Sequence, residues 1–285
     1  MNKDLGRLDL RDEKILEEQL SKIFKLLEDG QQEDARSTLV TLISTPNFFI
    51  REFIGKKLAE YKNTKSIEAI IKKLEGHKFY GVRATIIFYY FNKYITEPEK
   101  ILPILEKSWS NTPWETEYVI YDLWQNFPAL MKDVMLKWAD SEFEKKRAFA
   151  YHGLEAIAGT DIQYVTNIVE KNLDSDNEDM QKRIVLVLMN AIKSSPGELY
   201  SYIRHWLSNS SENRKKTLFT TMKKMITQAC YSNVNFKSPR TEEFYNLTMQ
   251  AIRDWKEDSD YSIASMGDKL VYFSKSPHLY ESESS

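Results

Sequence analysis

The sequence predicts an all-α fold, a right-handed α-solenoid of about six to seven stacked helix pairs with a concave groove. The first observation is a charged residue, usually basic, that occurs at nearly even intervals, each time followed by an apolar stretch typical of a helix. The marked positions are Arg51, Arg83, Glu117, Arg147, Arg183 and Lys215, at spacings of 32, 34, 30, 36 and 32 residues. Such periods are typical of helical repeats, because a single helix pair cannot bury its apolar face without a neighbour.

The second observation concerns the residues that precede this row. Six residues before the marked positions stand Thr45, His77, Asn111, Ser141, Asn177 and Asn209. Five of these six are of types that cap helix N-termini or form turns, by accepting a hydrogen bond from an orphaned backbone N–H. We therefore expect each marked residue in the first turns of the second helix of its pair. The third observation is a low content of helix breakers, nine glycines and eight prolines.

The helices can be placed in order along this register. Apolar residues at helical spacing predict the opening pair at 13–29 and 33–44, broken at Asp29-Gly30. The following helices are expected at 47–61, 65–76, 80–94, 98–109, 113–126, 128–139, 142–158, 161–173, 178–194, 196–207 and 211–230. Prolines 98, 113, 128 and 196 fall at or just before predicted starts, where the missing N–H has no helical partner to lose.

The ends of the chain depart from the repeat pattern. We predict one repeat domain over 13–230, preceded by a flexible start at 1–12. A polar loop, YSNVNFKSPR, should separate it from a helical extension or capping repeat within 231–273, with helices at 240–257 and 261–273. The remaining residues, 274–285, are polar and are expected to be disordered.

Composition excludes several classes of protein. The single cysteine, Cys230, cannot form a disulfide framework and fits a reducing compartment. The start is too polar for a signal peptide, and no apolar run approaches the roughly 18 residues of a membrane span. We expect a cytoplasmic protein without a membrane, metal or cofactor partner. The four histidines are not spaced as metal ligands, and no glycine-rich phosphate loop is present.

The marked basic residues allow two interpretations. A cation in the first turns of a helix opposes the helix dipole, which favours anions there by roughly 0.3–1 kcal/mol. Recurrence at five of six steps therefore requires another cause. One is a structural ladder in which each arginine bonds a loop or an adjacent repeat. The other is a basic row on the concave face that contacts phosphates. Overall charge is near neutral, with 40 basic and 42 acidic side chains, so any nucleic-acid surface must be local.

Five stretches carry a resemblance to a known family. They are FIREFIGKKLAEY (49–61), FYGVRATIIFYYFNKY (79–94), PWETEYVIYDL (113–123), LKWADSEFEKKRAFA (136–150) and QKRIVLVLMNAIKSSPG (181–197). In order and spacing they resemble the HEAT-like repeat DNA alkylation repair proteins, which are alkylpurine DNA glycosylases. The resemblance implies backbone binding of duplex DNA on the concave face. It also implies a tryptophan, an aspartate four residues later, an arginine of the next repeat and a second tryptophan at the reaction site.

Matched residue by residue, the resemblance is incomplete. Trp114 matches the first tryptophan and Arg147 the arginine, but the aspartate falls on Tyr118 and the second tryptophan on Leu186. A phenol with a reference pKa near 10 is neutral at working pH and cannot replace a carboxylate. Asp122, four residues beyond Tyr118 on the same helical face, and the adjacent Glu117 are the candidate catalytic carboxylates.

Three functions therefore stay open. The first is binding of duplex, possibly alkylated, DNA with glycosylase activity weak or lost. The second is a protein-interaction scaffold without DNA binding, since aromatic residues and arginine are enriched in protein-binding surfaces. The third is an active alkylpurine glycosylase that uses Asp122 or Glu117. The candidate DNA-binding residues are Trp114, Tyr118, Arg147, Arg83, Arg51, Lys146, Lys182, Arg183 and Lys215.

Overall fold

The computed structural model describes residues 8–208 and 210–275, and in that part of the chain every regular element is helical. The predicted fold class is confirmed: the helices pack in successive pairs, as in a helical solenoid. The chain divides into two compact units, Met1–Leu130 and Met131–Ser285, and each is described by itself.

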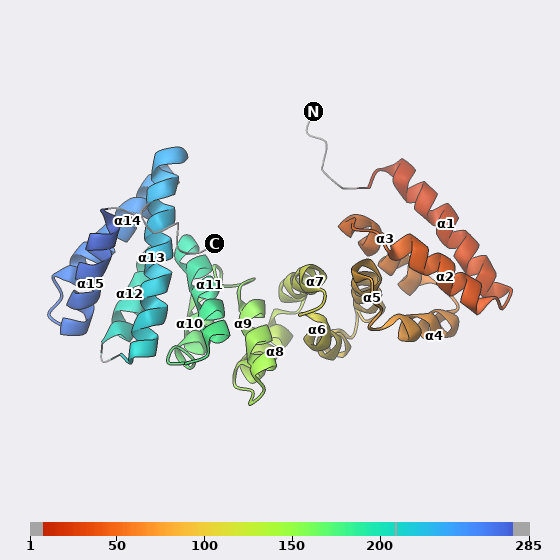
Figure 1. The fold of residues 1–285 in the computed structure, drawn as a ribbon, viewed down its shortest axis with the longest axis horizontal. Helices are drawn as coiled ribbons and strands as arrows, with labels where there is room; N and C mark the ends of the chain where they lie inside the picture. The colour runs from red at the N-terminus through yellow and green to blue at the C-terminus, as the bar shows by residue number, and fades with distance from the viewer. Residues whose placement is uncertain (1–7, 209, 276–285) are drawn as a thin grey trace. The chain divides into compact units, whose positions relative to one another are not determined.

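The first unit stacks its helices in two series (Figure 1). Its elements are α1 (Leu10–Glu28), α2 (Gln32–Ile43), α3 (Phe48–Glu60), α4 (Thr64–Leu74), α5 (Tyr80–Lys93), the short 3-10 helix η1 (Pro98–Lys100), α6 (Leu102–Ser108) and α7 (Pro113–Asn126). The odd-numbered helices pack in the order α1, α3, α5 and α7, while α2 packs on α4 and α6 on α5 and α7. The marked residues of this unit all lie on the odd-numbered series.

The second unit repeats the arrangement. The division falls within the first turn of α8 (Pro128–Ala139). It is followed by α9 (Glu144–Leu154), α10 (Ile162–Glu170), α11 (Glu178–Ser194), α12 (Pro196–Leu207), α13 (Glu212–Asn235), α14 (Pro239–Lys256) and α15 (Tyr261–Ser274). Helices α9, α11 and α13 pack in series, α12 packs on α10 and α14, and α15 closes against α12, α13 and α14.

Several predicted boundaries were wrong. Helix α1 begins at Leu10 rather than residue 13, because Asp9 and Asp12 form a reciprocal capping box at its start. Helix α13 runs to Asn235, so the expected polar loop from residue 231 is mostly helix; Ser238 and Pro239 then start α14. Helix α9 ends at Leu154, and the expected helix at 98–109 divides into η1 and α6. The segments 1–7 and 276–285 lie outside the described residues.

No helix in the described part of the chain is both long and apolar enough to cross a membrane.

Candidate functional site

The turns before α3 and α5 contain the same hydrogen-bond motif. In the first case, Thr45 Oγ1 accepts from the backbone N–H of Asn47 at 3.2 Å, and the Thr45 carbonyl accepts from Arg51 Nη1 at 3.1 Å. His77 Nδ1 and the His77 carbonyl accept in the same way from Phe79 and Arg83, at 3.2 and 2.6 Å. The arginine side chain therefore binds the turn that begins its own helix, which offsets its unfavourable place near the helix N-terminus.

The same motif occurs twice in the second unit and corrects the predicted register. The Ser141 carbonyl accepts from Arg147 Nη1 at 2.7 Å, and the Ser175 carbonyl accepts from Gln181 Nε2 at 2.8 Å. Gln181, not Arg183, therefore occupies the equivalent position in α11. The residues six before the row were expected to cap helix N-termini or to form turns. Thr45, His77 and Ser141 form the turn, because their side chains accept from the backbone N–H two residues later. The N-caps are these later residues, at Asn47, Phe79 and Phe143. Of the six, Asn177 is itself a cap, and Asn209 lies outside the described residues.

Helix α7 breaks the motif. Its N-cap is Thr112, so the position four residues later, which holds arginine in α3, α5 and α9, is Thr116 rather than Glu117. Thr116 is fully buried, and its neighbour Glu115 is buried as well, at 0% exposure. The sequence therefore identified the correct helix as the one that lacks the basic residue, but it assigned the position to Glu117 instead of Thr116.

Glu115 connects three helices through a buried polar network. Its Oε1 atom pairs with Arg51 of α3, and its Oε2 atom accepts from the Tyr80 hydroxyl of α5 at 2.6 Å. Arg51 is 4% exposed. Burial, and then the bond to Glu115, raise the pKa of Tyr80 well above its usual value, so the phenol stays a donor. This network holds α3, α5 and α7 together.

The structure therefore separates the predicted basic row into different roles. Arg51 cannot reach a phosphate, which contradicts its prediction as a DNA contact, because it is buried and neutralised by Glu115. Arg83 and Arg147 are half-buried and bind turn carbonyls, consistent with the structural interpretation. Lys182, which lies next to the row at Arg183, has a side chain 71% exposed, and Lys215 pairs with Glu212 of its own helix. Lys146 and Arg183 are half-buried and each makes an interaction.

The exposed face of α7 gathers three aromatic rings. Trp114, Tyr118 and Tyr121 are 70%, 41% and 52% exposed. They fall at positions i, i+4 and i+7, which lie on one helical face. Glu117, which is exposed, and Asp122, which is half-buried, lie on the same face. Helix α7 contains no lysine or arginine, and two of its three carboxylates, Glu117 and Asp122, lie on this face, whereas Glu115 is buried. Its surface therefore combines aromatic rings with negative charge.

Tyr118 is anchored within this surface. Its ring packs edge-on against Phe48 and Phe88, at 5.4 and 5.9 Å between centroids, and its hydroxyl donates to Glu52 Oε1 at 2.7 Å. Burial, the bond to Glu52 and the charge of Asp122 raise the pKa of Tyr118 to about 12. The phenol of Tyr118 is thus a neutral donor to a carboxylate of α3.

The two candidate catalytic carboxylates have ordinary surroundings. Asp122 Oδ2 accepts from Asn126 Nδ2 at 3.0 Å, and Glu117 is exposed to solvent. Leu186, in the place of the second tryptophan, is 40% exposed on α11. Trp114 lies in the first unit, whereas Arg147 and Leu186 lie in the second. No group of three or more metal-ligating side chains occurs within the described ranges.

Sequence reasoning missed the partners of the predicted residues. Glu115, Tyr80 and Glu52 were not singled out, although each contacts a residue that was. One partial signal was available: Glu115 and Glu117 flank Thr116, the position where α7 lacks the arginine of α3, α5 and α9, but the sequence does not distinguish the buried one of the two. The pairing itself joins residues 64 positions apart, and no local pattern reports it.

Comparison with known proteins gives only distant similarities. No family model matches the chain, and no curated protein matches it. A designed armadillo repeat protein in complex with the peptide (KR)4 is 13% identical, over 76% of this chain and 97% of that one, with a TM-score of 0.28. An engineered protein from a structural genomics consortium is 10% identical, over 93% of this chain and 95% of that one, with a TM-score of 0.27. Similarities this low carry no argument about function.

Proposed function

We propose that this chain is a protein-interaction module whose α7 face binds a cationic segment of a partner protein. The observation that supports this most directly is the composition of that face: three exposed aromatic rings beside carboxylates, on a helix without a basic residue. Aromatic faces attract lysine and arginine through their quadrupoles, and carboxylates pair with the same groups. Phosphates would meet repulsion at this surface.

The proposal is tested with short fluorescent peptides and the full chain. An arginine-serine repeat peptide is expected to bind, whereas a glutamate-serine peptide of equal length is not. Trp114→Ala should weaken binding about tenfold, which corresponds to about 1.4 kcal/mol, because the most exposed ring of the face is lost. Fluorescence anisotropy titration measures both affinities.

A matched control is Tyr272→Ala on α15, since Tyr272 is 73% exposed, close to the exposure of Trp114, but belongs to the second unit. That variant should bind the arginine peptide as the unchanged chain does. Equal binding of the two peptides, or unaltered affinity after Trp114→Ala, would exclude the α7 face as a site for cations.

The second candidate ligand is duplex DNA, which would bind to the second unit. Lys182 favours it, because its side chain is 71% exposed in the second turn of α11 and its ion pair with Asp179 is long, at 3.6 Å. Each lysine that contacts a phosphate adds about 0.9 to the slope of log affinity against log salt. Lys182→Ala should therefore lower that slope by about 0.9 for a fluorescent duplex. Trp114→Ala should leave it unchanged, and a chain that binds no duplex at low salt removes this candidate.

A further inference from the structure

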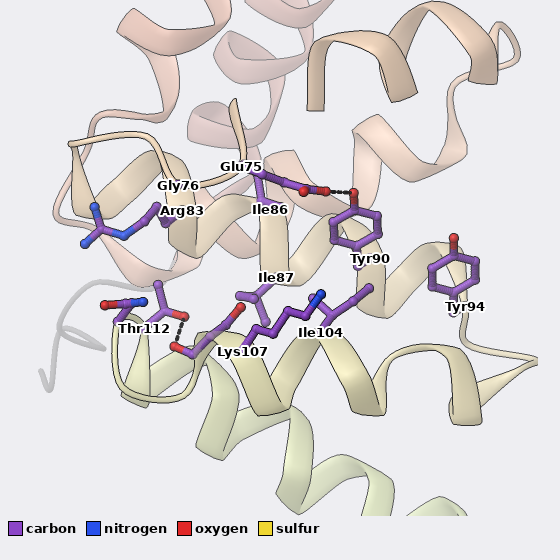
Figure 2. Close-up of a pocket in the computed structure, with 12 residues that line it drawn as sticks. Glu75, Gly76, Arg83, Ile86, Ile87, Tyr90, Tyr94, Ile104, Lys107 and Thr112 are labelled. Carbon is purple, nitrogen blue, oxygen red and sulfur yellow. Dashed lines mark hydrogen bonds between the residues drawn. The ribbon is translucent and has the colours of Figure 1, made fainter. Parts of the chain in front are cut away.

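The first unit contains a groove that is distinct from the α7 face. It has a volume of about 460 Å³, within the range of ligand-binding clefts. Figure 2 shows its walls: α5 forms one side, the Glu75–Gly76 turn lies at its edge, and α6 forms the other side. The lining includes none of the exposed aromatic residues of α7.

The groove has the dimensions of a helix-binding site. Its α5 wall carries Arg83, Ile87, Tyr90 and Tyr94, at positions i, i+4, i+7 and i+11 of one helical face. Eleven residues of helix extend about 16 Å, or three turns. Side chains of α6 and the following turn, from Ile104 to Asn111, line the opposite side. The α6 wall is shorter, because Leu102–Ser108 is a helix of about two turns. The groove between the two walls can take the apolar face of a third helix.

Each of the two walls of the groove carries one basic side chain, Arg83 on α5 and Lys107 on α6, together with apolar residues. Ile87 lines the groove from the α5 side, and Ile104 and Lys107 line it from the α6 side (Figure 2). Lys107 is exposed, and its ammonium group has no ion-pair partner in the described ranges. Arg83 binds neutral carbonyls, so its charge is not cancelled. Within the described lining, Glu75 is the one carboxylate, and it accepts from the Tyr90 hydroxyl.

The wall near Tyr90 is already ordered. The rings of Tyr90 and Tyr94 lie parallel, with centroids 6.1 Å apart and planes 5° apart, and the bond to Glu75 fixes Tyr90. Burial, followed by this bond, raises the pKa of Tyr90 above its usual range. A partner that lies on these rings loses little entropy in ordering them, which favours binding.

We propose that this groove binds an acidic amphipathic helix of a partner protein. The apolar residues of that helix would pack on Ile87, Ile104 and the two tyrosine rings, and its carboxylates would pair with Lys107 and Arg83. Charge complementarity decides the occupant: a basic helix would meet two cations, and an uncharged helix would leave both without a counterion. This site is independent of the cationic ligand proposed for the α7 face.

A displayed library of short helical peptides tests the inference on the full chain. Binders are selected on the unchanged chain and then measured against two variants, Lys107→Glu and Tyr94→Ala. Peptides whose affinity falls about tenfold or more on Lys107→Glu are expected to carry Asp or Glu beside Leu, Ile or Phe at helical spacing. Tyr94→Ala should weaken the same peptides.

Two controls separate this site from others. Lys65→Glu on α4 makes the same charge change at an exposed lysine outside the lining, and it should leave these affinities unchanged. Trp114→Ala should also have no effect on them, so failure of the α7 proposal does not affect this one. The inference is overturned if the Lys107-dependent peptides are basic or uncharged, or if no selected peptide depends on Lys107.

Discussion

Replacing Glu115 with glutamine is expected to lower the free energy of unfolding by about 3–5 kcal/mol. The substitution keeps the shape of the side chain but removes the charge that neutralises Arg51 in the interior. A buried guanidinium without a counterion is strongly unfavourable, because its hydration is lost and not replaced. Urea denaturation followed by circular dichroism measures the effect, with the transition of the first unit as the readout.

Two further variants make this prediction specific. Glu117→Gln removes a charge two residues away on the exposed face of α7, and it should change stability by less than about 0.5 kcal/mol. The double variant Arg51→Met with Glu115→Leu removes both charges and should recover most of the lost stability, since apolar side chains of similar volume often replace a buried pair without loss. Equal destabilisation by Glu115→Gln and Glu117→Gln would show that burial of the ion pair does not matter.

Gly55→Ala is expected to destabilise the first unit by about 3 kcal/mol. A methyl group at Gly55 would lie 2.5 Å from the Cβ atom of Phe88 and 2.9 Å from both the Thr85 carbonyl oxygen and the Tyr89 nitrogen. These atoms belong to the backbone and the first side-chain carbon of α5, so no side-chain rotation relieves the clash. Helices α3 and α5 must move apart, which weakens the packing of Phe88 against Phe48.

The control for this substitution is Gly197→Ala in α12. A Cβ atom at Gly197 meets nothing within 4 Å, so the alanine should stabilise the helix by up to about 1 kcal/mol through its higher helix propensity. Thermal unfolding by calorimetry distinguishes the two glycines. A Gly55→Ala variant as stable as the unchanged chain would show that α3 and α5 can separate without loss.

The sequence predicted the repeat and missed part of its register. The arginine spacing placed the odd-numbered helices correctly, because stacked repeats require similar helix lengths and turns. It failed at α11, where Gln181 makes the carbonyl bond that arginine makes in α3, α5 and α9. Glutamine and arginine are unlike by charge but alike in reach and in donating N–H groups. A pattern defined by charge therefore selected Arg183, two residues away.

The sequence predicted the helix face of the candidate site, but not which charged side chains surround it. Sequence periodicity put Trp114, Tyr118 and Asp122 on one face of a helix, and they do share that face. The arginines expected to accompany them are instead engaged in structure, and Arg51 is buried against Glu115. A sequence pattern reports spacing along one helix, whereas the partner of a side chain comes from a helix many residues away.

What the sequence alone determined is the all-helical class, the period and the helix order, because these depend on local propensity and on helical spacing. Tertiary structure alone decided which charges are available to a ligand. It placed Glu115 beside Arg51 and Glu52 beside Tyr118, and left Lys107 with Arg83 on an open groove. The physical reason is that burial and pairing, not residue type, determine whether a charge is neutralised within the fold or is open to a partner.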